Sequence, residues 1–169
     1  FDALGAITQY AEAIGLMFNF EWSNATLFYG LYARINSFWE NSDLAATGLP
    51  SPEELVLLDA VKDKIPAEVF AAEPAMAPTS GDKQLDRGNL RKASALLDAA
   101  GWAVGDDGMR RNAKGETLKV EFLEDDDAFA RVVNPYVENL RKLGVDASLS
   151  TIDSAQYTDR TRKFDFDMI

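Results

Sequence analysis

Four consecutive acidic residues, Glu124 to Asp127, form the densest group of chemically capable side chains in this 169-residue chain. Neighbouring carboxylates can hold a divalent metal ion or work as an acid–base pair. This cluster falls where a predicted strand ends and a predicted helix begins, a position at which the helix dipole favours negative charge. Metal-binding loops space their ligands around a glycine turn, which this stretch lacks. We therefore interpret the cluster as a helix start, with a carboxylate-based hydrolase as one alternative function.

The composition narrows the chemistry further. The chain has no histidine and no cysteine, so the commonest general base, the commonest zinc ligand and all thiol chemistry are missing. It also lacks a glycine-rich phosphate loop and a GxSxG nucleophile elbow. The net charge of −11 disfavours nucleic acid as a partner, because binding phosphates requires clustered lysine and arginine. We predict no catalytic residue, no metal ligand and no cofactor.

The stretch "RINSFW" is the candidate binding site. Arg34, Asn36 and Ser37 stand beside Phe38 and Trp39 in a segment without helical spacing. Ligand clefts have this composition, because aromatic rings supply contact area and a few polar groups fix the orientation of the ligand. The guanidinium could pair with a carboxylate or phosphate, and the rings could pack on a ligand side chain. Core packing is the competing interpretation for the other aromatic residues nearby.

The first half of the chain is predicted to be helical and then irregular. Apolar residues recur every three or four positions over Leu4–Phe18, and Ser23 or Asn24 is expected to cap a second short helix. The motif "SPEEL" predicts a helix with Ser51 as its N-cap, followed by a proline and by a glutamate at the third position. A proline- and alanine-rich surface excursion follows over 66–88. The helix after "SPEEL" is expected to bury Leu55, Leu58 and Val61.

The second half has a regular alternation of elements. "NLRKASALLDAAGW" predicts an amphipathic helix closed by Gly101, and two turn motifs around "MRR" predict a small antiparallel hairpin. Then follow the strand "LKVEFL", a helix kinked or restarted at Pro135, the strand "VDASLSTI", another helix and the strand "FDFDMI". Strands that alternate with helices indicate parallel crossovers, so the sequence predicts an α/β fold with a βαβαβ unit.

The last predicted strand raises an expectation about the whole chain. Its apolar residues Phe164, Phe166 and Met168 alternate with aspartates, and the last strand of a βαβαβ unit is normally central and buried. We therefore expect the chain to be one partial domain, 1–169, of a longer protein. Its expected parts are a helical segment and cleft-side chain over 1–50, helices with the excursion over 51–101, and the hairpin with the βαβαβ unit over 102–169.

These motifs, in this order, resemble the C-terminal lobe of family 5 extracellular solute-binding proteins. The resemblance rests on "AAGW", on the "LKVEF" strand, on "LRKLGV", on "D...Y..R" from Asp153 through Tyr157 to Arg160 or Arg162, and on the "FD" at Phe164. The N-terminal stretch "FNFEWSNATLFYGLYARINS" is similar to one subgroup of that family, which includes binding proteins for peptide-like antibiotics.

The resemblance implies a function. Members of the family are bilobal periplasmic receptors of ABC importers, with a type II-like α/β fold, that close around peptides. It implies that this chain is most of one lobe of a monomeric, exported protein, with a peptide or peptide-like ligand and ABC permease subunits as partners. A protein–protein interaction module without a small ligand is the first alternative, and the hydrolase is the second.

Overall fold

The computed structural model describes residues 3–45, 47–73 and 76–169. The chain divides into two compact units, one made of the residues up to Leu31 together with Thr79–Ile169, the other of Tyr32–Pro78. This division does not follow the expected boundaries at 50 and 101, and the expectation of one partial domain stays a prediction. No helix in the described ranges is both long and apolar enough to span a bilayer.

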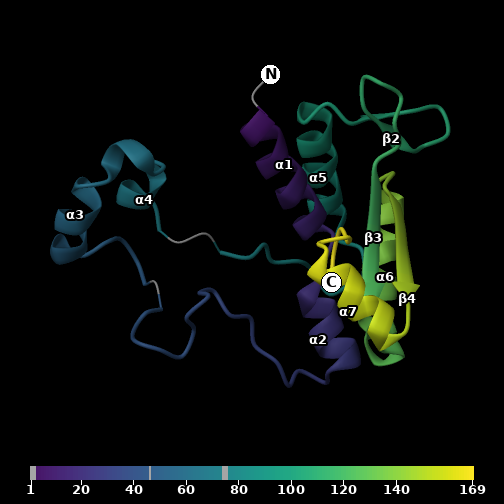
Figure 1. Ribbon diagram of the computed structural model, residues 1–169, viewed down its shortest axis with the longest axis horizontal. Coiled ribbons are helices and arrows are strands. Elements are labelled where there is room, and N and C mark those ends of the chain that lie inside the picture. The colour runs from purple at the N-terminus through teal and green to yellow at the C-terminus, as the bar shows by residue number, and fades with distance from the viewer. Residues whose placement is uncertain (1–2, 46, 74–75) are drawn as a thin grey trace. The chain divides into compact units, whose positions relative to one another are not determined.

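The first unit contains a parallel strand pair with a helical crossover (Figure 1). Strand β3 (Lys119–Glu124) pairs with β4 (Asp146–Thr151) from Lys119 opposite Asp146 to Glu124 opposite Thr151. Helix α6 (Ala130–Lys142) connects them, preceded by the short 3₁₀ helix η2 (Asp127–Phe129). The predicted strand–helix–strand crossover and the α/β class are therefore confirmed.

The prediction of a full C-terminal strand is wrong. After helix α7 (Ser154–Arg162), only Met168 pairs with β3, through a parallel bridge to Phe122 and a 2.8 Å hydrogen bond from the Leu123 N–H. Phe164 has a left-handed φ of 54° and a ring that is 84% exposed, so it cannot continue a pleated strand. The alternating pattern was misleading because its first aromatic residue terminates a helix.

Three helices and the strand pair enclose the core of the first unit. Helices α1 (Ala3–Leu16) and α5 (Arg87–Ala99) lie side by side (Figure 1). Helix α5 ends as predicted: Gly101 is left-handed with φ 87°, and the Trp102 N–H donates to the Leu97 carbonyl at 2.8 Å. The buried apolar side chains of α1, α5, β3, α6 and β4, and of residues next to these elements, form one cluster, which includes Met17, Ala93, Leu97, Val120, Phe122, Leu140, Val145 and Ala147.

The predicted hairpin is present and is anchored by a buried arginine. Strands β1 (Ala103–Val104) and β2 (Arg110–Arg111) pair antiparallel. The Arg110 side chain is 1% exposed, and its guanidinium donates to Leu143 O, Trp102 O, Asp98 and Ser94. One side chain thus joins the hairpin to the ends of α5 and α6.

Helix α6 differs from its prediction at Pro135. The helix runs through this proline as one continuous element, so it does not restart there. Tyr136 lies in the core and donates its hydroxyl to Ile14 O at 2.9 Å, and burial raises the pKa of its phenol. Asn139, which is 4% exposed, donates to Met17 O at 3.0 Å and to Gln84 O at 2.9 Å.

Helix α2 (Phe20–Leu27) begins earlier than predicted, because Asn19 rather than Ser23 or Asn24 is its N-cap. The Asn19 amide also donates to Gly81 O at 2.9 Å and to Lys83 O at 2.6 Å. Two residues further on, the Glu21 carboxylate accepts from the Ser80 N–H at 3.0 Å. The side chains at the start of α2 therefore hold residues 80–83, where the chain returns to the first unit after Pro78.

The second unit contains α3 (Pro52–Asp59), the 3₁₀ helix η1 (Lys62–Lys64) and the single-turn α4 (Glu68–Ala71). The predicted capping box at Ser51 is confirmed, with reciprocal hydrogen bonds to Glu54. The predicted burial is wrong: Leu55 is 37% and Val61 39% exposed, and no described residue of this unit is buried. A unit of this size has too few long-range contacts to enclose a core of its own.

Candidate functional site

The predicted binding stretch lies in the second unit as a series of turns. The Asn36 N–H donates to the Glu40 carboxylate at 3.1 Å, and the Trp39 N–H donates to the Ser37 hydroxyl at 3.2 Å. Polar side chains close to the backbone compete with regular secondary structure in this way. The sequence predicted irregular chain for this stretch, and its described residues indeed form no helix or strand.

The two aromatic residues of the stretch face solvent. Phe38 is 90% and Trp39 54% exposed, and their rings meet edge to face with centroids 5.1 Å apart. Arg34 is half-buried, while Asn36 is exposed and Ser37 is half-buried. The structure therefore offers apolar area beside polar groups here, and it places the five residues along one loop.

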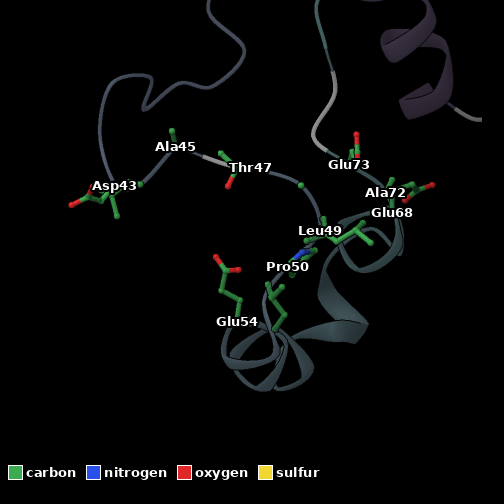
Figure 2. A pocket seen from close by; sticks show the side chains of 13 residues that line it. Asp43, Ala45, Thr47, Leu49, Pro50, Glu54, Glu68, Ala72 and Glu73 are labelled. Carbon is green, nitrogen blue, oxygen red and sulfur yellow. The ribbon is translucent and has the colours of Figure 1, made fainter.

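A cavity of about 830 Å³ lies elsewhere in the same unit (Figure 2). None of the five predicted residues lines it, and we call it the acidic pocket because its charged lining residues are all carboxylates. Its apolar lining residues include Leu49 and Pro50. The charged residues that line it are Asp43, Glu54, Glu68 and Glu73.

The acidic pocket could attract cationic groups. Carboxylates around an open cavity produce a negative potential that favours ammonium and guanidinium groups. No group of three metal-ligating side chains occurs among the described residues. The Glu54 carboxylate is already engaged with the Ser51 N–H at 2.7 Å. Sequence reasoning missed this pocket because its walls, Asp43–Leu58 and Glu68–Glu73, are joined only by tertiary contacts.

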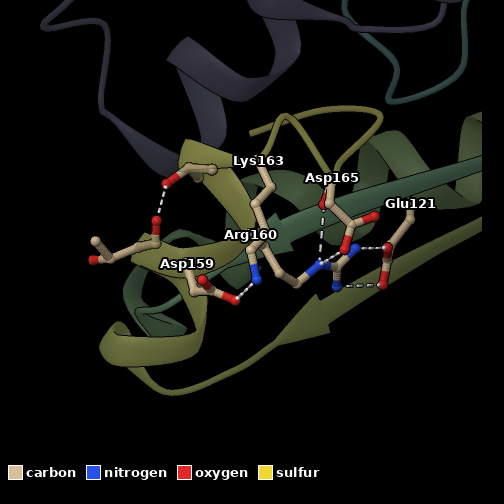
Figure 3. Close-up of polar contacts among 7 residues, drawn as sticks. Glu121, Asp159, Arg160, Lys163 and Asp165 are labelled. Carbon is tan, nitrogen blue, oxygen red and sulfur yellow. Dashed lines mark hydrogen bonds and ion pairs between the residues drawn. The ribbon is translucent and has the colours of Figure 1, made fainter.

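The arginine of the "D...Y..R" motif has a structural role (Figure 3). The Arg160 guanidinium donates to the Glu121 carboxylate at 2.7 Å and to Asp165 at 3.1 Å. These bonds connect α7 to β3 and to the C-terminal segment. The hydrogen bond from Arg160 lowers the pKa of the Glu121 carboxyl, although partial burial opposes that shift. At the start of α7, Asp153 accepts from the Ala155 and Gln156 N–H groups as the N-cap.

The acidic cluster of residues 124–127 is a junction between two elements. Glu124 ends β3, and Asp126 is the N-cap of η2, where its carboxylate accepts from the Ala128 N–H at 2.8 Å. Asp127 lies in the first turn of η2, where the helix dipole favours negative charge. The interpretation of this cluster as a helix start is therefore confirmed.

Comparison with known proteins identifies the family. Residues 11–169 match the protein family described as "Bacterial extracellular solute-binding proteins, family 5 Middle". A probable peptide-binding protein, YejA, of Agrobacterium fabrum is 44% identical over 157 residues, which are 93% of this chain and 25% of that protein. The chain belongs to the family 5 bacterial extracellular solute-binding proteins.

Solved structures support the same fold. The chain is similar to NikA from Brucella suis, solved in complex with Fe(III)-EDTA, with a TM-score of 0.59, 24% identity and coverage of 95% of this chain and 26% of NikA. It is equally similar to an oligopeptide-binding protein from Thermus thermophilus solved with a pentapeptide, with a TM-score of 0.59, 18% identity and coverage of 94% and 22%. The chain thus spans about a quarter of the length of the family 5 proteins that it matches.

Proposed function

We propose that this chain is part of the substrate-binding component of an ABC importer, which captures peptides or peptide-like solutes between two lobes and delivers them to the permease. The observation that carries the proposal is membership of family 5 across residues 11–169. The 44% identity to a probable peptide-binding protein supports peptides as the ligand class.

The proposed activity is binding and release and not catalysis. The ligand would bridge the two lobes and shift the population towards the closed form, which the permease recognises. Peptide backbones are held mainly by hydrogen bonds, with roomier contacts for side chains. This cycle breaks no covalent bond, so it requires no base, nucleophile or metal ion. We accordingly propose that the protein is a receptor and not an enzyme.

The proposed partners and location follow from the same role. The full-length protein would act in the periplasm as a monomer, and its macromolecular partners would be the membrane-embedded permease subunits. The net charge of −11 supports the view that nucleic acid is not a partner.

We propose that Arg34, Asn36, Ser37, Phe38 and Trp39 contact the ligand. The exposure of both rings supports this assignment, because a ligand could cover them. The guanidinium of Arg34 would pair with a carboxylate or phosphate of the ligand.

One observation favours a second candidate function, a surface for a protein partner. The second unit exposes apolar side chains on α3 and in the loop before it, among them Phe38 at 90%, Leu57 at 74% and Val56 at 73%. Apolar residues that gather on a surface often mark an interface with another protein. This candidate predicts binding of a protein without any small ligand.

The first test uses the full-length gene product purified from a periplasmic extract. Native mass spectrometry would identify molecules that co-purify, and thermal shift with mixed peptides of two to six residues would follow. A bound peptide-like mass, or a rise in Tm of several degrees, would support a peptide receptor. An empty protein that no peptide stabilises would contradict it and favour the second candidate.

The contact assignment has its own test. In the full-length protein, Arg34→Ala should weaken peptide binding by about tenfold or more in calorimetry, since a charge-assisted hydrogen bond is lost. Arg91→Ala, which removes an exposed arginine from α5, is the matched control and should bind as the unaltered protein does. Equal affinity of both variants would refute the role of Arg34.

A further inference from the structure

Tyr29 occupies a backbone position that normally belongs to glycine. Helix α2 ends at Leu27, and the Phe28 and Gly30 N–H groups both donate to Asn24 O, at 3.2 and 2.9 Å. Tyr29 lies between them with a left-handed φ of 55°. This closing turn favours glycine at that place, because a side chain there crowds the backbone.

The packing of the chain gives no reason for a tyrosine at this position. The Tyr29 side chain is 85% exposed, and it has no hydrogen-bond or ring partner among the described residues. Its neighbour Phe28 differs, because the Arg131 guanidinium lies 5.8 Å from the centre of that ring. The end of α2 is therefore attached to α6 through Phe28, and Tyr29 projects from it.

A second aromatic residue has the same backbone geometry but a different environment. Phe164 follows α7, with a φ of 54° and 84% exposure. Its ring lies 6.5 Å from the ring of Phe166, so it has a partner within the chain. Phe164 is therefore a natural comparison for Tyr29, with an equally strained backbone and a ring that is already in contact.

We propose that the Tyr29 ring is a ligand contact that binds an aromatic or large aliphatic side chain of the peptide. This inference rests on the proposed function. A strained residue whose side chain has no partner among the described residues is a candidate for a functional role. Tyrosine supplies a large, rigid apolar face at low entropic cost, which suits recognition of an apolar side chain. Tyr29 also stands five residues before Arg34, in the stretch that leads into the proposed contacts.

The test uses the full-length protein and pairs of peptides of three to six residues that differ only by phenylalanine in place of one alanine. Calorimetry would compare the unaltered protein with Tyr29→Gly, Tyr29→Phe and Phe164→Gly. We expect Tyr29→Gly to lose about tenfold in affinity for the phenylalanine peptide and about threefold or less for its alanine partner. Tyr29→Phe and Phe164→Gly should bind both peptides as the unaltered protein does.

The Tm of each variant separates loss of contact from loss of fold. Glycine relieves the left-handed strain at either position, so both glycine variants should melt at the same or a higher temperature. Unchanged discrimination between the paired peptides in Tyr29→Gly, or an equal loss in Phe164→Gly, would overturn the inference while peptide binding itself stands. If the unaltered protein binds no peptide, the proposed function fails, and this inference fails with it.

Discussion

Replacing Arg110 with methionine tests how the hairpin is attached to the core. Methionine fills a similar volume without any donor, so the change removes every hydrogen bond of the guanidinium and leaves no large cavity. Two of the acceptors are backbone carbonyls, Leu143 O at 2.8 Å and Trp102 O at 2.6 Å. The other two are the Ser94 hydroxyl at 2.5 Å and the Asp98 carboxylate at 2.7 Å.

The expected loss of stability follows from which acceptors can reach water. The Asp98 side chain is 56% exposed, so its carboxylate is solvated by water once the arginine is gone. The Leu143 and Trp102 carbonyls lose a donor inside the fold, at about 1–3 kcal/mol each. Relief from burying the guanidinium, which is 1% exposed, offsets part of this cost. We therefore expect Arg110→Met to lower the free energy of unfolding by about 3 kcal/mol.

Urea denaturation of the 169-residue chain, followed by circular dichroism, would measure this loss. Arg91→Met is the matched control: the same substitution on the exposed face of α5 should change the free energy of unfolding by about 0.5 kcal/mol or less. Arg110→Lys should lose almost as much as the methionine variant, because one ammonium cannot reach four acceptors in different directions. A loss below about 1 kcal/mol in Arg110→Met would refute the assignment of Arg110 as the anchor.

Two further predictions concern the first unit. A Cβ at Gly144, where φ is +93°, would lie 2.7 Å from Gly108 O, whereas one at Gly115, where φ is +81°, would meet no atom within 4 Å. In urea denaturation Gly144→Ala should therefore lose about 3 kcal/mol and Gly115→Ala about 1 kcal/mol, and equal losses would contradict the steric argument. The pKa of the Glu121 carboxyl is lowered by its hydrogen bond with Arg160. This bond therefore stabilises the fold at pH values above the ordinary pKa of glutamate, and the stabilisation is lost as the pH falls through the lowered pKa. The difference in stability between the unaltered chain and Arg160→Gln should thus shrink when urea titrations are repeated from pH 7 down to below about pH 4, and a constant difference would exclude this linkage.

Features of the fold that depend on neighbouring residues could be predicted from the sequence. The capping box at Ser51, the left-handed Gly101 after α5 and the parallel crossover through α6 follow from local spacing. The start of α2 could not be predicted in the same way. Asn19 is its cap and also holds Gly81, which lies far along the chain, so the choice among three polar residues was decided by tertiary contacts.

The sequence was least informative where burial depends on distant residues. The alternation in "FDFDMI" predicted a strand, but Phe164 ends a helix, and only Met168 reaches β3. The spacing on α3 predicted a buried face, but the unit around it provides no core. For the site, the aromatic and polar composition of "RINSFW" predicted a ligand cleft, and that assignment stays a prediction. The acidic pocket, whose two walls are separated in sequence, could not be found in this way.

The contacts of Asn19 and Glu21 with Gly81, Lys83 and Ser80 also bear on how the family could vary in evolution. These hydrogen bonds hold the segment that follows the Tyr32–Pro78 unit against the start of α2, the helix that precedes the unit. The chain segments before and after the unit are therefore linked by hydrogen bonds between residues of the first unit. Doubling the length of a loop whose ends are held in this way costs only about 0.6 kcal/mol in closure entropy. Insertions and deletions between Tyr32 and Pro78 should accumulate among relatives with little effect on the folding of the first unit, and this stretch is where receptors of the family could diversify at the lowest thermodynamic cost.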